Sequence, residues 1–305
     1  MNYELNDDQA GILAGLDQLL AAHAGGASGE PENFFYGAAL DTALAESGFL
    51  DIARIDGFGP LDAALVVERL ARLPQVVEAA ASALIAPLLP LEPGERPLAL
   101  VSGDATRPAR FLPVARHLLV LRQNDALLVS MEGTSIEPVE SLMAYPYGRL
   151  DSLNGLSAQT LANAVDIRRR WRIALAAEAA GCMAAALDTV IEHVRTRQAF
   201  GRPLGAFQAI QHRLAMAAET AESAKWLAFR AAWSDCEADA AIAAGFVQER
   251  IARFTYDLHQ FSGAMGLTLE FPLHLWTYRL RALAGELGGA SMQARAAAQA
   301  VWGVA

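Results

Sequence analysis

The sequence predicts a mainly α-helical protein with a small β domain between two helical regions. Apolar residues recur at helical spacing up to about residue 89, and again from about residue 160 to the end. Between them, residues 97–150 carry short apolar runs separated by turn residues. The 305-residue chain is 53% hydrophobic and 19% charged, which excludes intrinsic disorder. We assign residues 1–92 to an N-terminal helical domain, 93–153 to a shortened β domain, and 154–305 to a C-terminal helical bundle.

The N-terminal region contains a helix start and two breaks. Asn6 and Gln9 have the spacing at which each side chain can bind the other residue's backbone N–H group, as at helix starts. The Gly-rich residues 24–31 predict a flexible loop, and residues 57–60 predict a second break. Helical spacing resumes over residues 61–73.

Three short apolar runs predict strands in the middle region, over residues 98–101, 118–121 and 126–129. The polar residues 123–125 between the last two runs predict a hairpin.

Three helical stripes predict the C-terminal bundle, because each would bury one face against its neighbours. Their members are Leu187, Val190, Ile191 and Val194; then Phe207, Ile210, Leu214, Ala217, Ala221, Ala224 and Ala228; then Val247, Ile251, Phe254, Leu258 and Phe261.

Charge and cysteine content narrow the class of protein. The net charge is −10, so we expect no nucleic-acid partner. The arginines at 168–170 predict either a phosphate-binding group or, preferably, a solvated helix start.

Cys182 is predicted to be a buried thiol. It lies in an apolar stretch, residues 173–187, which is interrupted by Glu178 and is too short to span a bilayer. With no secretion-type N-terminus, we expect a cytoplasmic protein without a membrane segment. The spacing of the six histidines predicts no metal site.

Residues 195–208 join a helix end, a Gly/Pro turn and a helix start, with arginines gathered at the turn. An arginine there can cap the helix dipole, which the spacing alone favours, or hold a diphosphate with its planar fork.

The pattern Arg197-x-x-Phe200-Gly201-x-Pro203-Leu204-x-x-Phe207-Gln208 resembles the signature that opens the C-terminal domain of acyl-CoA dehydrogenases. Residues 260–273, from Gln260-Phe261-Ser262-Gly263 to Glu270-Phe271-Pro272-Leu273, are similar to a second segment of that family. The order of helical domain, middle β-barrel and four-helix bundle is also the family's order. Here the barrel is truncated.

The resemblance implies an FAD-dependent subunit that dehydrogenates an acyl-CoA thioester between its α and β carbons. It implies that Arg197 and Gln208 hold the diphosphate and adenosine side of FAD, and that Phe200 packs beside the cofactor. Gln260 and Gly263 would contact FAD from a neighbouring subunit. The implied assembly is a homodimer or a hetero-tetramer with a longer acyl-CoA dehydrogenase chain, with an electron-transfer flavoprotein or similar acceptor.

The sequence departs from the family at the catalytic base. Ungapped matching from Gln260 places Leu287 at the usual base position, and Glu286 lies one residue earlier. Some members carry the base on the first long bundle helix, where Trp171 stands here. Glu286 is either a base re-aimed by a kink near Gly285 and Gly288, or a solvated helix-end carboxylate.

The family's Thr-Glu-Pro-x-x-Gly-Ser stretch, which packs against the flavin and the acyl-CoA, is missing between residues 90 and 103. We therefore expect a short subunit that completes its site with a longer partner, as in heteromeric enzymes of the steroid-side-chain type. The alternatives are a self-contained dehydrogenase with Glu286 as base, and a flavin-free homologue with a structural or binding role.

Overall fold

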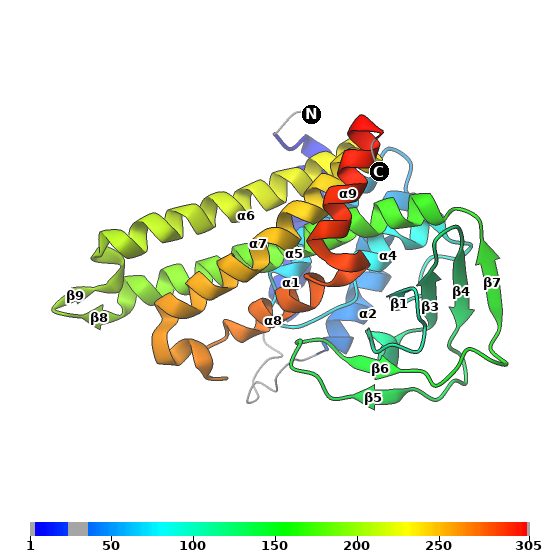
Figure 1. Cartoon of the computed structure of the whole chain (residues 1–305), viewed down its shortest axis with the longest axis horizontal. Helices are drawn as coiled ribbons and strands as arrows, with labels where there is room; N and C mark the ends of the chain where they lie inside the picture. Colours follow the sequence, from blue (N-terminus) through cyan, green and yellow to red (C-terminus); the bar gives the residue numbers. More distant parts are fainter. Residues whose placement is uncertain (1–3, 24–35, 304–305) are drawn as a thin grey trace.

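The computed structural model describes residues 4–23 and 36–303, and it shows the three predicted regions in order (Figure 1). The helices of the bundle run side by side, with the β domain at one end and the hairpin of β8 (Gln198–Ala199) and β9 (Arg202–Pro203) at the other. The predicted loop at residues 24–31 lies outside the described residues.

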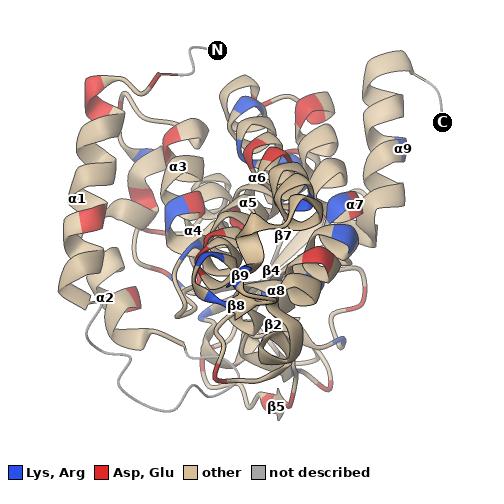
Figure 2. Ribbon diagram, turned by 90° about the vertical axis from the view of Figure 1, so that its left-hand side faces the viewer, with Lys and Arg blue, Asp and Glu red and all other residues tan. Residues whose placement is uncertain are grey.

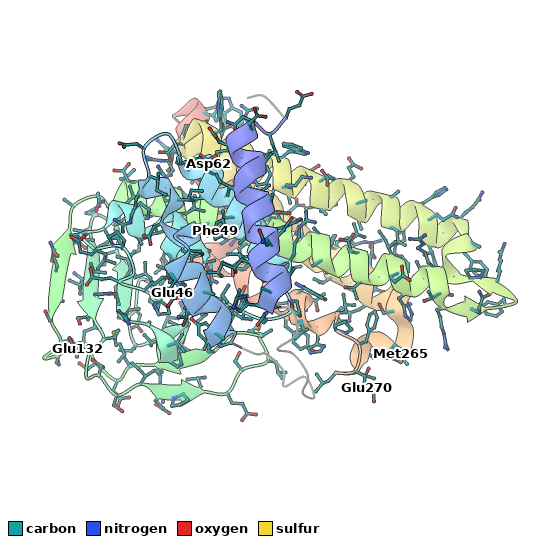
Figure 3. The ribbon with its side chains drawn as sticks, turned by 180° about the vertical axis from the view of Figure 1, so that it is seen from behind. Glu46, Phe49, Asp62, Glu132, Met265 and Glu270 are labelled. Atoms are coloured by element: carbon teal, nitrogen blue, oxygen red, sulfur yellow. The ribbon has the colours of Figure 1, made fainter. Side chains whose placement is uncertain are left out.

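The N-terminal region is helical, as predicted. It consists of α1 (Asp7–His23), α2 (Ala38–Glu46), η2 (Phe49–Arg54), α3 (Pro60–Ala71), α4 (Ala80–Leu84) and η3 (Ala86–Leu88). The reciprocal cap before α1 is confirmed, since Gln9 N donates to Asn6 Oδ1 at 2.8 Å and Asn6 N to Gln9 Oε1 at 3.2 Å. Phe49 packs against α1 at Gly15 (Figure 3). Pro60 opens α3 instead of belonging to the break, because a first-turn proline loses no intrahelical hydrogen bond.

The β domain consists of two sheets. One contains β1 (Leu98–Ser102), β3 (His117–Leu121), β4 (Ala126–Ser130) and β7 (Ala158–Leu161) in the order β1-β3-β4-β7. The other contains β2 (Ala109–Arg110), β6 (Tyr147–Arg149) and β5 (Glu137–Val139), with η4 (Leu112–Val114) beside it. The predicted β3–β4 hairpin is confirmed, with Arg122 N donating to Asp125 O at 2.9 Å. Because β7 pairs with β4, the sheet crosses the predicted domain boundary at residue 153.

The C-terminal bundle is built from α5 (Ala164–Thr196), α6 (Gln208–Ser234), α7 (Glu237–Ser262) and α9 (Gly289–Trp302), with α8 (His274–Leu283) beside them. The third predicted stripe is fully buried along α7, and the second is buried in α6 from Leu214 onward. Short elements complete the bundle: β8 (Gln198–Ala199), β9 (Arg202–Pro203), η5 (Leu204–Ala206), η6 (Gly263–Leu267) and η7 (Glu286–Gly288).

α5 is the core helix of the bundle. By length and composition it could cross a bilayer, but 83% of its most apolar 18-residue window is buried inside the protein. The apolar stretch at residues 173–187 is thus part of a 33-residue helix, and the length of that helix does not exclude a membrane span. Its burial against the neighbouring helices accounts for its apolar character.

The three arginines at the start of α5 are half-buried and bind groups on other elements. Arg169 and Arg170 both pair with Asp235 at 2.9 Å, and Arg168 Nη2 donates to the carbonyl of Arg122 at 2.7 Å. They fasten the helix start to the α6–α7 turn and to the β3–β4 hairpin, which sequence spacing could not show. Seen from the hairpin end, basic and acidic segments are interspersed on the helices (Figure 2).

Candidate functional site

A cavity of about 460 Å³ lies where the β domain meets the bundle. β1 and β2 line one side, and the end of α8 and η7 line the other. The polar side chains on its wall include those of Arg110, Tyr147 and Glu286, with the indole of Trp171 beside them. The two positions at which the sequence could place a base, Trp171 and the Glu286–Leu287 pair, therefore meet in one cavity.

The carboxylate of Glu286 is held at both oxygens. Arg110 Nε donates to Oε1 at 2.6 Å, and the indole N–H of Trp171 donates to Oε2 at 2.7 Å. Only 15% of the Glu286 side chain is exposed. It is thus not the solvated helix-end carboxylate that the sequence left open, since a strand and a helix more than 100 residues away supply its partners.

Arg110 is shared between two carboxylates. Its Nη1 donates to both oxygens of Glu178, at 3.0 and 2.9 Å, and the hydroxyl of Tyr145 donates to Glu178 Oε1 at 2.8 Å. Burial alone would lower the pKa of Arg110, but the nearby Glu178 and Glu286 carboxylates raise it well above its ordinary value. The pKa of the Tyr145 hydroxyl is also raised, first by burial and then by Glu178, so the phenol stays a donor.

The backbone of η7 aims Glu286 into this cluster. Leu287 has φ 51° and ψ 27°, so the predicted kink exists, and it lies one residue after Glu286. Gln248 Nε2 donates to the carbonyl of Glu286 at 2.9 Å, and Gln293 Nε2 donates to that of Leu287 at 3.1 Å. A positive φ at a leucine costs free energy, and these two amides from α7 and α9 compensate by fixing the turn.

Sequence reasoning missed Arg110, Glu178 and Tyr145. A signal for Glu178 was present, because a single carboxylate within the apolar face of a buried helix must find a partner. No local pattern marks Arg110 or Tyr145 as that partner. They reach Glu178 only because the three-stranded sheet packs against α5 and η7.

The residues that the resemblance assigns to the cofactor lie at the opposite end of the bundle (Figure 1). Phe200 forms the tip of the β8–β9 hairpin and is 94% exposed. Both turn residues have positive φ, 53° at Phe200 and 77° at Gly201. Such a two-residue turn matches the twist of the strands but normally contains small residues. Here it places the aromatic ring of Phe200 in solvent.

Three polar side chains assigned to the cofactor, those of Arg197, Gln208 and Gln260, are exposed. Within residues 4–23 and 36–303 they make no hydrogen bond or ion pair. Gly263 ends α7 with φ 59°, and the segment that follows returns to α5, where Phe271 contacts the ring of His193. Figure 3 shows Met265 and Glu270 at this same end, far from Glu132 of the β domain.

His259 fixes the turn after Gly263. Its Nδ1 lies 2.8 Å from the carbonyl oxygen of Gly266, and its Nε2 lies 3.0 Å from Thr277 Oγ1. Burial lowers the pKa of His259, and the charges of Arg281 and His274 add to this effect. The neutral imidazole therefore joins η6 to α8.

These features fit half of a site for FAD. A free guanidinium at a helix end suits a diphosphate, and the exposed hairpin ring offers a stacking surface. Both are exposed at this end of the bundle. The cavity beside the β domain lies at the other end, and the Arg110 cluster forms part of its wall. For metals, the described part of the chain holds no group of three or more His, Cys, Asp or Glu side chains suited to an ion.

Comparison with known proteins matches residues 169–301 to the family described as "Acyl-CoA dehydrogenase, C-terminal domain". Over these residues the chain is similar to the C-terminal domain of acyl-CoA dehydrogenases. It is 36% identical over 122 residues to acyl-CoA dehydrogenase FadE34 of Mycobacterium tuberculosis, covering 38% of this chain and 17% of that protein. It is 26% identical over 175 residues to acyl-CoA dehydrogenase IpdE2 of Mycolicibacterium smegmatis, covering 55% of this chain and 56% of that protein. The match therefore spans little more than half of these relatives at most.

The fold is similar to that of a chain in the crystal structure of the ChsE4-ChsE5 complex from Mycobacterium tuberculosis. The TM-score is 0.77 at 20% identity, and the match covers 97% of each chain. This likeness confirms the predicted family fold.

Proposed function

We propose that this chain is one subunit of a hetero-oligomeric, FAD-dependent acyl-CoA dehydrogenase that oxidises an acyl-CoA thioester between its α and β carbons. The observation that carries the proposal is the group formed by Arg197, Phe200, Gln208 and Gln260. These side chains are exposed at the end of the bundle, and in the described part of the chain the three polar ones make no hydrogen bond or ion pair.

In this proposal the chain contributes binding groups to a cofactor held mainly by its partner. Arg197 and Gln208 bind the diphosphate and adenosine side, and Phe200 packs beside the cofactor. Gln260, at the end of α7, reaches FAD across the subunit interface together with Gly263. FAD, when bound, would accept the hydride that leaves the β carbon of the thioester.

The partner we propose is a longer acyl-CoA dehydrogenase chain that carries the Thr-Glu-Pro-x-x-Gly-Ser stretch missing here. The similarity to a chain of the ChsE4-ChsE5 complex supports a partner of this kind. Bulky thioesters such as those of steroid side chains are the proposed substrates, and an electron-transfer flavoprotein or similar protein the proposed acceptor.

The test compares this chain alone with this chain coexpressed with a full-length acyl-CoA dehydrogenase chain. We expect flavin absorbance and acyl-CoA turnover only in the coexpressed complex. In that complex, Arg197→Gln should raise the Kd for FAD about ten- to a hundredfold, because a charge-assisted hydrogen bond contributes about 1.5–3 kcal/mol.

Arg195→Gln is the matched control. Arg195 lies on the last turn of the same helix, but it is 73% exposed and its guanidinium lies 4.0 Å from Glu192. This variant should retain flavin as the wild type does. A colourless complex would instead favour a structural or binding role without FAD. An Arg197→Gln complex that keeps its flavin would show that Arg197 does not hold the cofactor.

A further inference from the structure

The cluster around Arg110 has a composition that a catalytic carboxylate would not need. It contains one guanidinium, two carboxylates, a phenol and an indole N–H, contributed by β2, η7, α5 and the segment before β6. Arg110 and Glu178 are 7% exposed, and Tyr145 is 1% exposed. The charged and titratable neighbours on the packed elements include Arg279 on α8, Tyr147 on β6 and Cys182 on α5.

Each oxygen of Glu286 already has a donor, and one of these donors carries a full positive charge. A general base must lie within hydrogen-bond reach of the proton that it removes. Both oxygens of Glu286 are instead directed at protein donors on β2 and α5, so the carboxylate is oriented toward the cluster.

The backbone at Glu286 is also held in place. Its own carbonyl is held by Gln248, and the following carbonyl by Gln293, which in turn accepts from Arg172 Nε at 2.7 Å. The kink therefore fixes the backbone from which the carboxylate reaches Arg110.

We propose that Arg110 is a positioning residue that converts Glu286 from a potential base into a fixed counter-ion. The cavity beside β1, β2 and η7 then performs no proton abstraction, and the cluster serves to fasten the β domain to the bundle. This inference rests on the proposed function, in which the longer partner supplies the base.

The test uses the wild-type and variant complexes with the longer partner, assayed with octanoyl-CoA or a steroid side-chain CoA thioester and a dye acceptor. In the Glu286→Gln complex we expect kcat, KM and flavin content within about twofold of wild type. A kcat lowered a hundredfold or more, with flavin content and KM unchanged, would overturn the inference by showing that Glu286 is the base.

Glu137→Gln is the matched control, because Glu137 pairs with Arg149 at the same 2.6 Å distance on the exposed face of the β domain. Where the Glu286→Gln complex fails to assemble, Glu286→Asp replaces it. Aspartate keeps the charge for Arg110 but withdraws the carboxylate by one methylene. A counter-ion role predicts nearly normal kcat, and a base role predicts at least a tenfold loss.

The outcomes separate this inference from the proposed function. If the wild-type complex is active and Glu286→Gln is not, the inference fails and the hetero-oligomeric function stands. If the chain alone binds flavin and turns over acyl-CoA, the proposed function fails. Glu286→Gln in that homo-oligomer then decides the role of Glu286 separately.

Discussion

Replacing Arg110 with methionine should destabilise the protein strongly, because it leaves two carboxylates without their shared cation. Methionine preserves much of the side chain's length but none of its charge. Among the described residues, Glu178 would retain only the Tyr145 hydroxyl as donor, and Glu286 only the Trp171 indole. Breaking a buried ion pair by removing one partner costs about 3–5 kcal/mol. At about 2 °C per kcal/mol for a chain of this size, Tm should fall by about 6–10 °C.

Urea unfolding followed by tryptophan fluorescence and circular dichroism measures this loss. A double-mutant cycle with Glu286→Gln should give a coupling energy of about 1–3 kcal/mol, because the double variant no longer strands the Glu286 charge. The control is Arg149→Met, which breaks an exposed ion pair of the same length, 2.6 Å, and should leave the unfolding free energy unchanged. An Arg110→Met variant as stable as the control would refute the argument that this cluster fastens the two regions.

Two further predictions test other parts of the fold. Gly181→Ala should cost about 1–3 kcal/mol in urea unfolding, because its Cβ would collide with the Glu68 carbonyl oxygen and push α5 away from α3. Unchanged stability would contradict this close approach. Because burial lowers the pKa of His259, the unfolded chain binds its proton more readily, so stability should fall as the pH decreases through about 6.5. His259→Gln should make Tm less dependent on pH between about 7.5 and 5.5, and an equally steep fall would show that other groups cause it.

The sequence predicts much of the fold because its signals are local. Val247, Ile251, Phe254, Leu258 and Phe261 repeat at helical spacing and are all buried along α7. The polar residues between two apolar runs form the β3–β4 turn. β7 escaped prediction because its residues, Ala158–Leu161, are mostly exposed and lack an apolar run; its pairing with β4 makes it a strand.

The candidate site divides in the same way. The residues of the hairpin motif are contiguous, so the sequence alone shows Arg197, Phe200 and Gln208 near one turn. The role of Glu286 was undecidable, since a base and a solvated carboxylate have the same local sequence. Its actual partners are Arg110, 176 positions away, and Trp171, 115 positions away.

The sequence by itself thus determined the helical and β regions, the family resemblance and the grouping of Arg197, Phe200 and Gln208 around one turn. Each depends on spacing within a few turns of chain. Only the tertiary structure decided that the arginines at the start of α5 are paired and that Glu286 is bound on both oxygens. These outcomes depend on which segments pack together, and the low polarity at their junction requires each buried charge to find a partner from another element.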